Sequence, residues 1–192
     1  MTKDPNKNRN EEDFKQQIAI LKEVAEVMKK YGLPPILYGG VALGIVRDGD
    51  FIPWDFDGDF FVDIKRCLGK ATQIAADLKH LGYTDVKTWD GKKDWKVGCE
   101  KHDYHIDIHG FFRKGKLFIS KRKRSNGKYS VYRFPAKYMD NLQTVEFRGY
   151  KFQIPKDADG FFTHMYGDWQ KPKRTVKHSE YLTSRFKKVV KK

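Results

Sequence analysis

Three aspartates at alternate positions, Asp55, Asp57 and Asp59, are the residues of this chain best suited to chemistry. Alternate residues of a strand point to the same face of a sheet, so an extended segment here would place three carboxylates on one side. Like charges at that spacing repel each other, and Mg²⁺ or Mn²⁺ would offset the repulsion because hard cations prefer carboxylate oxygens. We expect two of the three to bind the ions directly, with the pair left open. A solvated acidic strand is the alternative for the trio alone.

A glycine pair, Gly39 and Gly40, precedes the aspartates by about one helix length. The pair follows a short apolar strand and opens a predicted helix over residues 40–46. Free backbone N–H groups and the helix dipole make such a turn a place to hold phosphate. Close packing of strand against helix is the alternative. A phosphate turn followed by clustered carboxylates indicates metal-assisted transfer of a phosphate-containing group.

A fourth carboxylate, Asp107, lies on a predicted strand between Ile106 and Ile108. An adjacent strand could bring Asp107 to the trio, where it would complete a metal site or act as a general base. A half-exposed strand carboxylate is the alternative. His105 and His109 share its side and raise the option of a zinc site. Same-face residues of one strand are ~6.5 Å apart, which disfavours three ligands on one ion.

Four motifs together resemble the LicD family of phosphotransferases, which includes the fukutin-like proteins. They are Gly-Gly-x-x-Leu-Gly-x-x-Arg over 39–47, Phe-Ile-Pro-Trp-Asp-x-Asp-x-Asp over 51–59, His-Ile-Asp-Ile over 105–108 and Tyr-Gly-Asp over 166–168. The family is similar in fold to the DNA polymerase beta-like nucleotidyltransferases. The resemblance therefore implies an α/β (α+β) fold with a nucleotidyltransferase-like mixed sheet flanked by helices, which agrees with the helix-strand-helix-strand opening of the chain.

The resemblance also implies an activity and a set of site residues. Members of the family move phosphocholine, ribitol phosphate or glycerol phosphate from a CDP-activated donor to a hydroxyl of a glycan, with Mg²⁺ or Mn²⁺. Catalysis and metal binding fall on Asp55, Asp57, Asp59 and Asp107. Substrate binding falls on Gly39, Gly40, Arg47, Trp54, Tyr166 and Asp168.

Several of these substrate-binding residues also have simpler interpretations. Arg47 would pair with the donor pyrophosphate through its planar guanidinium or neutralise the carboxylates. Trp54 would stack on a base, form a wall of the metal site or pack in the core. Asp168 would orient a loop or the acceptor, although helix capping at Gly167 explains part of that segment.

The net charge of +14, with a pI of about 9.6, attracts anions without choosing among them. A nucleotidyltransferase acting on RNA or a small molecule is the alternative enzyme, and a non-catalytic polyanion-binding module is the alternative outside enzymes. None of the matching aspartates is lost, which favours an enzyme. The basic run 121–124 is expected at a hairpin tip, with contact to a polyanion or lipid headgroup as the second interpretation.

The chain divides into a disordered tail over 1–10, a catalytic domain over 11–178 and a basic C-terminal helix over 179–192, which would help to dock an anionic acceptor. Further helices are predicted over 11–30, 65–81 and 159–166. Strands are predicted over 36–38, 59–64, 85–89, 95–100, 104–112, 116–120, 128–134 and 144–154, with a hairpin over 147–152 in the last of these. The absence of a leader, the lack of an apolar run near ~20 residues and two isolated cysteines predict a cytoplasmic protein without a membrane span. Peripheral contact at the inner membrane surface stays open.

Overall fold

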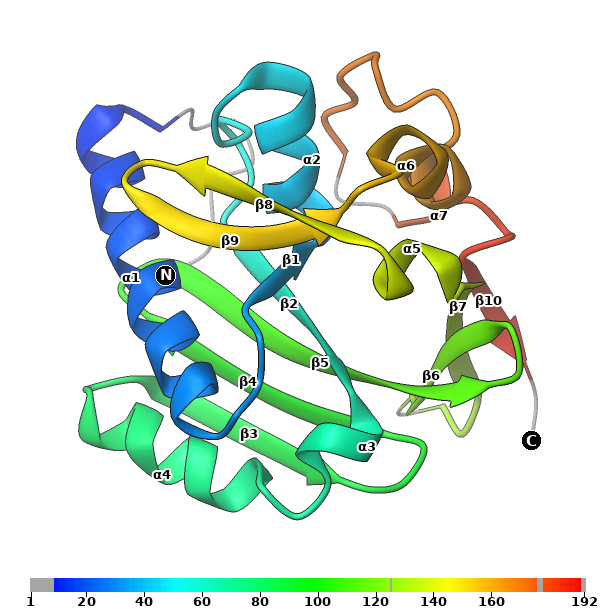
Figure 1. Cartoon of the computed structure of the whole chain (residues 1–192), viewed down its shortest axis with the longest axis horizontal. Coiled ribbons are helices and arrows are strands. Elements are labelled where there is room, and N and C mark those ends of the chain that lie inside the picture. Colours follow the sequence, from blue (N-terminus) through cyan, green and yellow to red (C-terminus); the bar gives the residue numbers. More distant parts are fainter. Residues whose placement is uncertain (1–8, 125, 176–177, 191–192) are drawn as a thin grey trace.

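A mixed sheet runs through the centre of the molecule in the computed structural model (Figure 1). The structure describes residues 9–124, 126–175 and 178–190. Within that part of the chain the sheet has ten strands. They are β1 Ile36–Tyr38, β2 Asp57–Asp63, β3 Thr84–Asp90, β4 Trp95–Lys101, β5 Tyr104–Lys114, β6 Leu117–Lys123, β7 Tyr129–Pro135, β8 Leu142–Phe147, β9 Tyr150–Pro155 and β10 Lys187–Val190. The helices are α1 Glu11–Lys30, α2 Gly39–Asp48, α3 Ile64–Cys67, α4 Ala71–His80, α5 Lys137–Asp140, α6 Ala158–Tyr166 and α7 His178–Tyr181.

β2 and β5 lie side by side in the middle of the sheet and run parallel. β2 also pairs with β1, whose other edge carries the hairpin of β9 and β8. The second edge of β5 pairs with β4 along its first half and with β6 along its second half. β7 and β10 follow β6. This mixed sheet with helices against it confirms the predicted fold class.

α1 forms where the apolar spacing predicts a helix. Asn10 and Asp13 make a reciprocal capping box that satisfies backbone donors at its first turn. Its apolar stripe, which includes Leu21, is buried against the sheet. A Cβ added at Gly58 of β2 would lie 2.9 Å from Leu21 and 2.6 Å from Ile106, so Gly58 allows the helix to pack closely on the centre of the sheet. α4 packs beside α1 and covers β3 and β4.

The opposite face of the sheet carries an aromatic cluster at the junction of its two halves. Phe61 of β2 lies with its ring centroid 5.5 Å from Phe111 and 5.0 Å from Phe118. Phe134 of β7 joins them, and Phe161 of α6 meets Phe134 edge to face at 5.4 Å. All of these rings are buried. The cluster therefore fixes α6 over the same face of the sheet that carries the odd-numbered residues of β2.

The prediction of a basic helix over 179–192 is wrong for the described residues. α7 ends at Tyr181, and Lys187–Val190 forms β10, which pairs antiparallel with β7. Phe186 is 3% exposed and packs against Tyr132 and Phe134. Burying that ring directs the following residues along the open edge of β7, and two successive valines suit a strand. Residues 191–192 lie outside the described residues.

Three smaller differences concern the ends of elements. The predicted helix over 65–81 is two helices, because the chain turns at Gly69 with a φ of +82°. The predicted disordered tail over 1–10 includes two ordered residues, because Arg9 is buried and Asn10 caps α1. Residues 1–8 lie outside the described residues. The basic run 121–124 is mostly strand, because β6 continues to Lys123.

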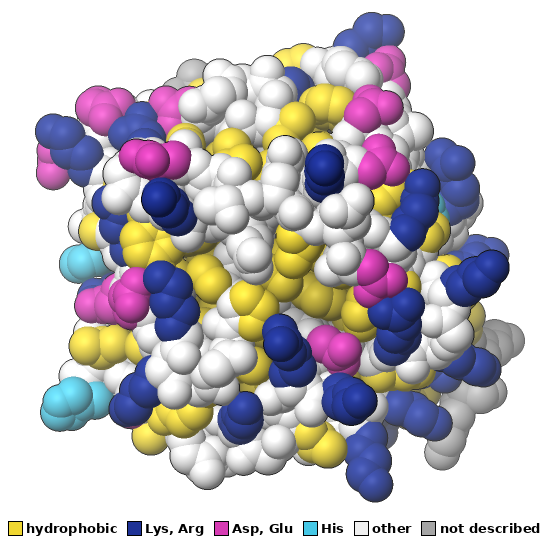
Figure 2. All heavy atoms as spheres, viewed as in Figure 1, with side chains coloured by type: hydrophobic (Ala, Val, Ile, Leu, Met, Phe, Trp, Pro, Cys, Tyr) yellow, Lys and Arg dark blue, Asp and Glu magenta, His cyan; other side chains and the backbone are white. Residues whose placement is uncertain are grey.

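No helix in the described part of the chain is long and apolar enough to cross a membrane. Lys and Arg side chains are spread over the molecule and gather toward the right-hand edge of Figure 2, the side on which Figure 1 shows β6, β7 and β10. The net charge of +14 is therefore not confined to one segment.

Candidate active site

The pairing of β2 with β5 brings two of the predicted carboxylates together. Asp59 lies directly opposite Asp107 in the parallel register, and both side chains point to the face that carries the aromatic cluster. Asp59, Asp107 and His109 each offer a ligand atom, and these atoms lie within 4.8 Å of one another. The register therefore explains how residues 48 positions apart in the chain form one site.

The aspartate trio does not lie on a single strand as expected. Asp57 opens β2 and is exposed, whereas Asp55 lies in the turn before the strand. The backbone N–H of Asp57 donates to the Asp55 carboxylate at 3.2 Å, which holds that turn. The turn curls Asp55 toward the start of α2, where a continuous strand would have carried it further away.

Three glycines make room for three carboxylates. A Cβ on Gly40 would lie 1.8 Å from a carboxylate oxygen of Asp55, and one on Gly39 would lie 2.6 Å from an oxygen of Asp59. Gly98 of β4 has the same relation to Asp107, at 2.8 Å. Gly39 also has a φ of +75°, which side chains disfavour. The glycine pair thus brings the backbone at the start of α2 into contact with the acidic cluster.

Asp107 is surrounded by positive and hydrogen-bonding groups. Lys96 Nζ donates to its carboxylate at 2.5 Å, and the Nε2 atoms of His105 and His109 each lie 3.0 Å from it. Burial alone would raise the pKa of Asp107, but His109, His105 and Lys96 outweigh burial and hold that pKa well below its usual range. Asp107 is therefore ionised at neutral pH.

The pKa values of the two histidines shift in opposite directions. Burial and the positive charge of Arg122 lower the pKa of His109 to about 4, so His109 is neutral at neutral pH. Its Nδ1 contacts the hydroxyl of Tyr38, at the end of β1. The hydrogen bond to Asp107 raises the pKa of His105. A neutral, fixed imidazole beside two carboxylates is available as a metal ligand.

The pKa of Asp59 is shifted in the opposite direction from that of Asp107. Burial and then the charges of Asp107, Asp57 and Asp55 raise the pKa of Asp59 well above its usual range. The protein alone therefore places too little positive charge near Asp59 to stabilise its ionised form. A bound divalent cation would supply that charge. Asp59 and Asp107 offer two oxygen ligands beside the one nitrogen of His109, and Asp57 and Asp55 act on Asp59 through their charges. Such an oxygen-rich surrounding suits Mg²⁺ or Mn²⁺ better than zinc.

The predicted substrate-binding residues divide into two groups. Tyr166 joins the site, because burial and the charges of Asp59 and Asp55 raise the pKa of its phenol well above the usual value. Arg47 binds Asp48 through two hydrogen bonds of 2.8 and 2.7 Å, and its charge acts on Tyr166, whose pKa it lowers against the larger effect of burial. Asp168 forms an exposed ion pair with Lys171 at 3.0 Å. Its role in substrate binding stays a prediction.

Trp54 lies next to Asp55 and is half buried against the core. The guanidinium of Arg174 lies 5.4 Å from its ring, a cation–π contact that binds the C-terminal segment to this turn. Packing against the core and contact with Arg174 therefore both involve Trp54, and its role toward a substrate stays a prediction. Gly167, which follows Tyr166, closes α6 with a φ of +76° and a hydrogen bond to Thr163.

Sequence reasoning missed several cationic and aromatic residues of the site. Lys96 could not be found because its contact depends on the pairing of β4 with β5. Arg9 lies over the rings of Phe56 and Tyr104, at 3.8 and 4.6 Å, and interacts electrostatically with Asp55 and Asp57. The additional residues near the carboxylates are Arg9, Lys96, Arg122, Tyr132 and Tyr181.

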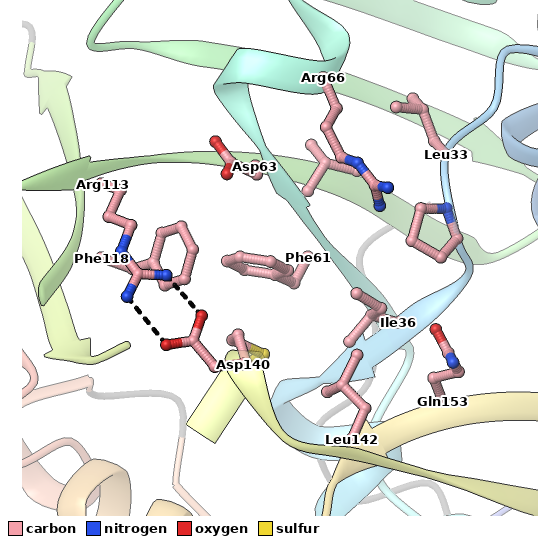
Figure 3. Close-up of a pocket in the computed structure, with 13 residues that line it drawn as sticks. Leu33, Ile36, Phe61, Asp63, Arg66, Arg113, Phe118, Asp140, Leu142 and Gln153 are labelled. Atoms are coloured by element: carbon pink, nitrogen blue, oxygen red, sulfur yellow. Dashed lines mark hydrogen bonds and ion pairs between the residues drawn. The ribbon is translucent and has the colours of Figure 1, made fainter. Parts of the chain in front are cut away.

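A separate cavity of about 290 Å³ lies further along β2, beyond Phe61 (Figure 3). Its walls include Arg66 and Arg113, and Arg113 binds Asp140 through two hydrogen bonds of 2.5 and 2.9 Å. None of the predicted site residues lines it. Phe61 and Phe118 of the aromatic cluster form part of its wall, so the cavity is distinct from the carboxylate site.

Residues 32–157 match the family described as LicD/FKTN/FKRP, nucleotidyltransferase domain. The chain belongs to this family. The LicD match covers about two thirds of the chain and contains the glycine pair, the aspartate trio and Asp107. It ends before Tyr166, so the Tyr-Gly-Asp segment lies outside the matched part.

Two curated relatives in the LicD family are "Ribitol 5-phosphate transferase FKRP" of Mus musculus and of Homo sapiens. Each is 25% identical over 148 residues, which is 75% of this chain and 30% of the relative. The chain therefore spans less than a third of the length of these proteins. Among solved structures, a putative nucleotidyltransferase from Thermotoga maritima aligns with a TM-score of 0.46 and 13% identity, over 76% of this chain and 81% of that chain. ANT(2″)-Ia in complex with adenylyl-2″-tobramycin aligns with a TM-score of 0.45 and 13% identity, over 73% and 70%.

Proposed function

We propose that this chain is a metal-dependent transferase that moves a substituted phosphate from a CDP-activated donor to a hydroxyl of a glycan. The transferred group is of the phosphocholine, ribitol phosphate or glycerol phosphate type. The observation that carries the proposal is the pairing of Asp59 with Asp107 across β2 and β5, directly beside the glycine-lined start of α2. Membership of the LicD family, with ribitol 5-phosphate transferases among the relatives, supports the same chemistry.

The start of α2 suits the phosphates of the donor. Its N-cap residue, Tyr38, makes no side-chain capping bond, and the first turn contains no acidic residue. The side chain of Tyr38 therefore does not occupy the backbone N–H groups of the first turn, which begins beside the acidic cluster. Phosphate oxygens of the donor would accept from these groups. Tyr166, held over the cluster by α6, would limit the access of water.

Asp59, Asp107 and His109, whose ligand atoms lie within 4.8 Å of one another, would hold Mg²⁺ or Mn²⁺, and Asp55 and Asp57 would complete the set. When bound, the ion would offset negative charge on the attacking and leaving oxygens. The low pKa of Asp107 favours its role as an ionised ligand over the role of a general base. The acceptor hydroxyl would attack the phosphorus of the transferred group, and CMP would leave.

The decisive experiment measures CMP release from CDP-ribitol, CDP-glycerol and CDP-choline with Mg²⁺ or Mn²⁺. Asp57→Asn should abolish release and leave the circular dichroism spectrum unchanged, because an exposed carboxylate at the start of β2 is lost without a change in packing. Asp63→Asn is the matched control on the same face of the same strand. Asp63 caps α3 through a hydrogen bond of 2.9 Å to Lys65, and asparagine can make the same bond. Full turnover by Asp57→Asn would refute the assignment.

The nucleotidyltransferase alternative acts on RNA or a small molecule, and the net charge of +14 favours it over an uncharged acceptor. The same panel distinguishes it when nucleoside triphosphates are added with the RNA. Pyrophosphate release with no CMP release from any CDP donor would replace the first proposal by this one.

A further inference from the structure

Arg9 is a buried residue beside the acidic cluster, and it lies outside the four motifs. It is 7% exposed. Its backbone N–H donates to the carbonyl of Pro53 at 2.9 Å. Pro53 begins the turn over residues 53–57, the catalytic turn, which carries Asp55 and Asp57. This hydrogen bond therefore joins the segment before α1 to the catalytic turn.

The guanidinium of Arg9 lies over two aromatic rings. Its Cζ atom is 3.8 Å from the centroid of the Phe56 ring and 4.6 Å from that of Tyr104. Cation–π contacts of this kind are stronger when they are shielded from water. The carbonyl of Phe56 also accepts a backbone hydrogen bond of 3.0 Å from β5. Arg9 therefore holds the ring of Phe56, while β5 holds its main chain.

α1 holds this arrangement from the other side. Gln17, a buried residue of α1, accepts a hydrogen bond from Nη1 of Arg9. The hydroxyl of Tyr104 donates to the backbone carbonyl of Asp13 at 2.6 Å, in the first turn of the same helix. The guanidinium and one of the rings beneath it are thus both bonded to α1, which packs on the centre of the sheet.

The remaining donors of Arg9 lower the stability of the fold. Its Nε and Nη2 atoms are buried and have no hydrogen-bond partner among the described residues. Burying donors of a charged group without an acceptor costs free energy of folding. The charge of Arg9 nevertheless acts on Asp55 and Asp57. A buried cation that is kept at this cost beside two carboxylates indicates a role in the site.

We propose that Arg9 is a positioning residue of the active site, which acts by holding the ring of Phe56. Asp55 and Asp57 flank that ring in the chain. Fixing the ring therefore sets where both carboxylates lie relative to the metal ligands on β2 and β5. The inference rests on the proposed function for the presence of the ion, and it concerns a residue that precedes the part of the chain matched to the LicD family.

A positioning role and a purely electrostatic role predict changes of opposite sign in metal affinity. A cation near a metal site repels the ion, so loss of the charge alone would strengthen binding. Loss of a residue that orients metal ligands typically weakens binding by about 10–100-fold. Arg9→Gln should therefore weaken Mn²⁺ binding by about tenfold or more. Titration followed by the electron paramagnetic resonance signal of free Mn²⁺ measures this affinity without turnover.

A matched control removes an exposed charge from the same helix. Lys15 forms an ion pair with Glu12 at 3.5 Å, and its side chain is 64% exposed. Lys15→Gln should change Mn²⁺ binding by less than about twofold, because salt screens exposed charges.

Two further variants test the contact itself. Arg9→Lys keeps the charge without the planar guanidinium and should bind Mn²⁺ at an intermediate level. Phe56→Leu removes the ring from a half-buried position that leucine can fill, and it should weaken binding as Arg9→Gln does. The double variant should bind no more weakly than the weaker single variant, since both substitutions remove the same contact. The number of Mn²⁺ ions bound per chain should stay the same, whereas a partly unfolded variant would bind fewer.

Tighter or unchanged Mn²⁺ binding by Arg9→Gln would overturn the proposal, because the charge would then be all that Arg9 contributes. Equal weakening by Lys15→Gln, additive losses in the double variant, or no Mn²⁺ binding by the wild type would also overturn it. Fewer ions bound at unchanged affinity would assign Arg9 to folding alone. If Arg9→Gln weakens Mn²⁺ binding as expected and the wild type releases no CMP from any CDP donor, the proposed function fails and the positioning role stands.

Discussion

Asp59→Asn should make the metal-free protein more stable at neutral pH while it removes transfer activity. Asp59 is a carboxylate whose pKa is raised by burial and by Asp107, Asp57 and Asp55. The substitution removes the charge and keeps nearly the same shape. Since native proteins are only marginally stable, the gain should be measurable.

The magnitude follows from the geometry of the pair. Ligand oxygens of Asp59 and Asp107 lie within 4.8 Å. Two unit charges at that separation repel by about 3.5 kcal/mol at an effective dielectric constant of ~20. Lys96, 2.5 Å from Asp107, cancels part of this repulsion. We therefore expect a gain of about 1–2 kcal/mol, which corresponds to a rise in Tm of about 2–8 °C for a chain of this size.

The difference in stability between Asp59→Asn and the wild type depends on pH. Because the pKa of Asp59 is higher in the folded state than in the unfolded state, the folded protein binds more protons between those two values. The free energy of unfolding of the wild type therefore falls as pH rises through that window. Asparagine does not titrate, so the advantage of Asp59→Asn should vanish near pH ~4, the unfolded pKa of aspartate, and increase above it.

Thermal melting followed by circular dichroism, in EDTA over a pH series, measures this difference. Added Mg²⁺ should raise the Tm of the wild type and raise that of Asp59→Asn less, since a ligand stabilises the state that binds it. Asp63→Asn, on the same strand, should show neither effect. A lower Tm for Asp59→Asn at neutral pH, or a difference that does not change with pH, would refute the electrostatic reasoning.

Two further substitutions test the surrounding structure. Gly40→Ala places a Cβ 1.8 Å from the present position of an Asp55 oxygen and should lower the rate of CMP release by about 100-fold, with helix content unchanged because alanine suits a helix. Arg148→Gln removes paired hydrogen bonds to Glu11 and Asp50 and should lower the Tm at neutral pH. Arg148 lowers the pKa of both acids, so its stabilisation is present above their unfolded pKa values and is lost as pH falls through the lowered ones. Equal Tm differences in acid and at neutral pH would contradict that account.

The parts of the fold with local patterns could be predicted from the sequence. The apolar spacing of α1 and the alternation in β5 follow from the helix and strand periods, and both elements formed where expected. The proximity of Asp59 and Asp107 followed from the family motifs, because no local pattern specifies which strands pair. The family motif also placed Tyr166 among the substrate-binding residues, and burial together with the charges of Asp59 and Asp55 raises the pKa of its phenol.

Other features depend on contacts between distant segments, which no local sequence pattern indicates. Lys96 contacts Asp107 only because β4 and β5 pair in a register that aligns Gly98 with Asp107. β10 forms because β7 presents an open edge beside the buried Phe186, whereas the lysines of that segment suit a helix equally well. Asp55 leaves the strand for a turn that one backbone hydrogen bond to its carboxylate stabilises.

The contacts of Gly39, Gly40 and Gly98 with three different carboxylates restrict how this site can evolve. Every amino acid that one base change can substitute for glycine carries a Cβ, and at each position that atom would lie within 2.8 Å of a carboxylate oxygen. Substitutions there should therefore cause abrupt losses, and no series of graded intermediates is open to them. Graded change is instead open on β6 and β7, where side chains such as Arg122 and Tyr132 approach the carboxylates and can be exchanged one at a time.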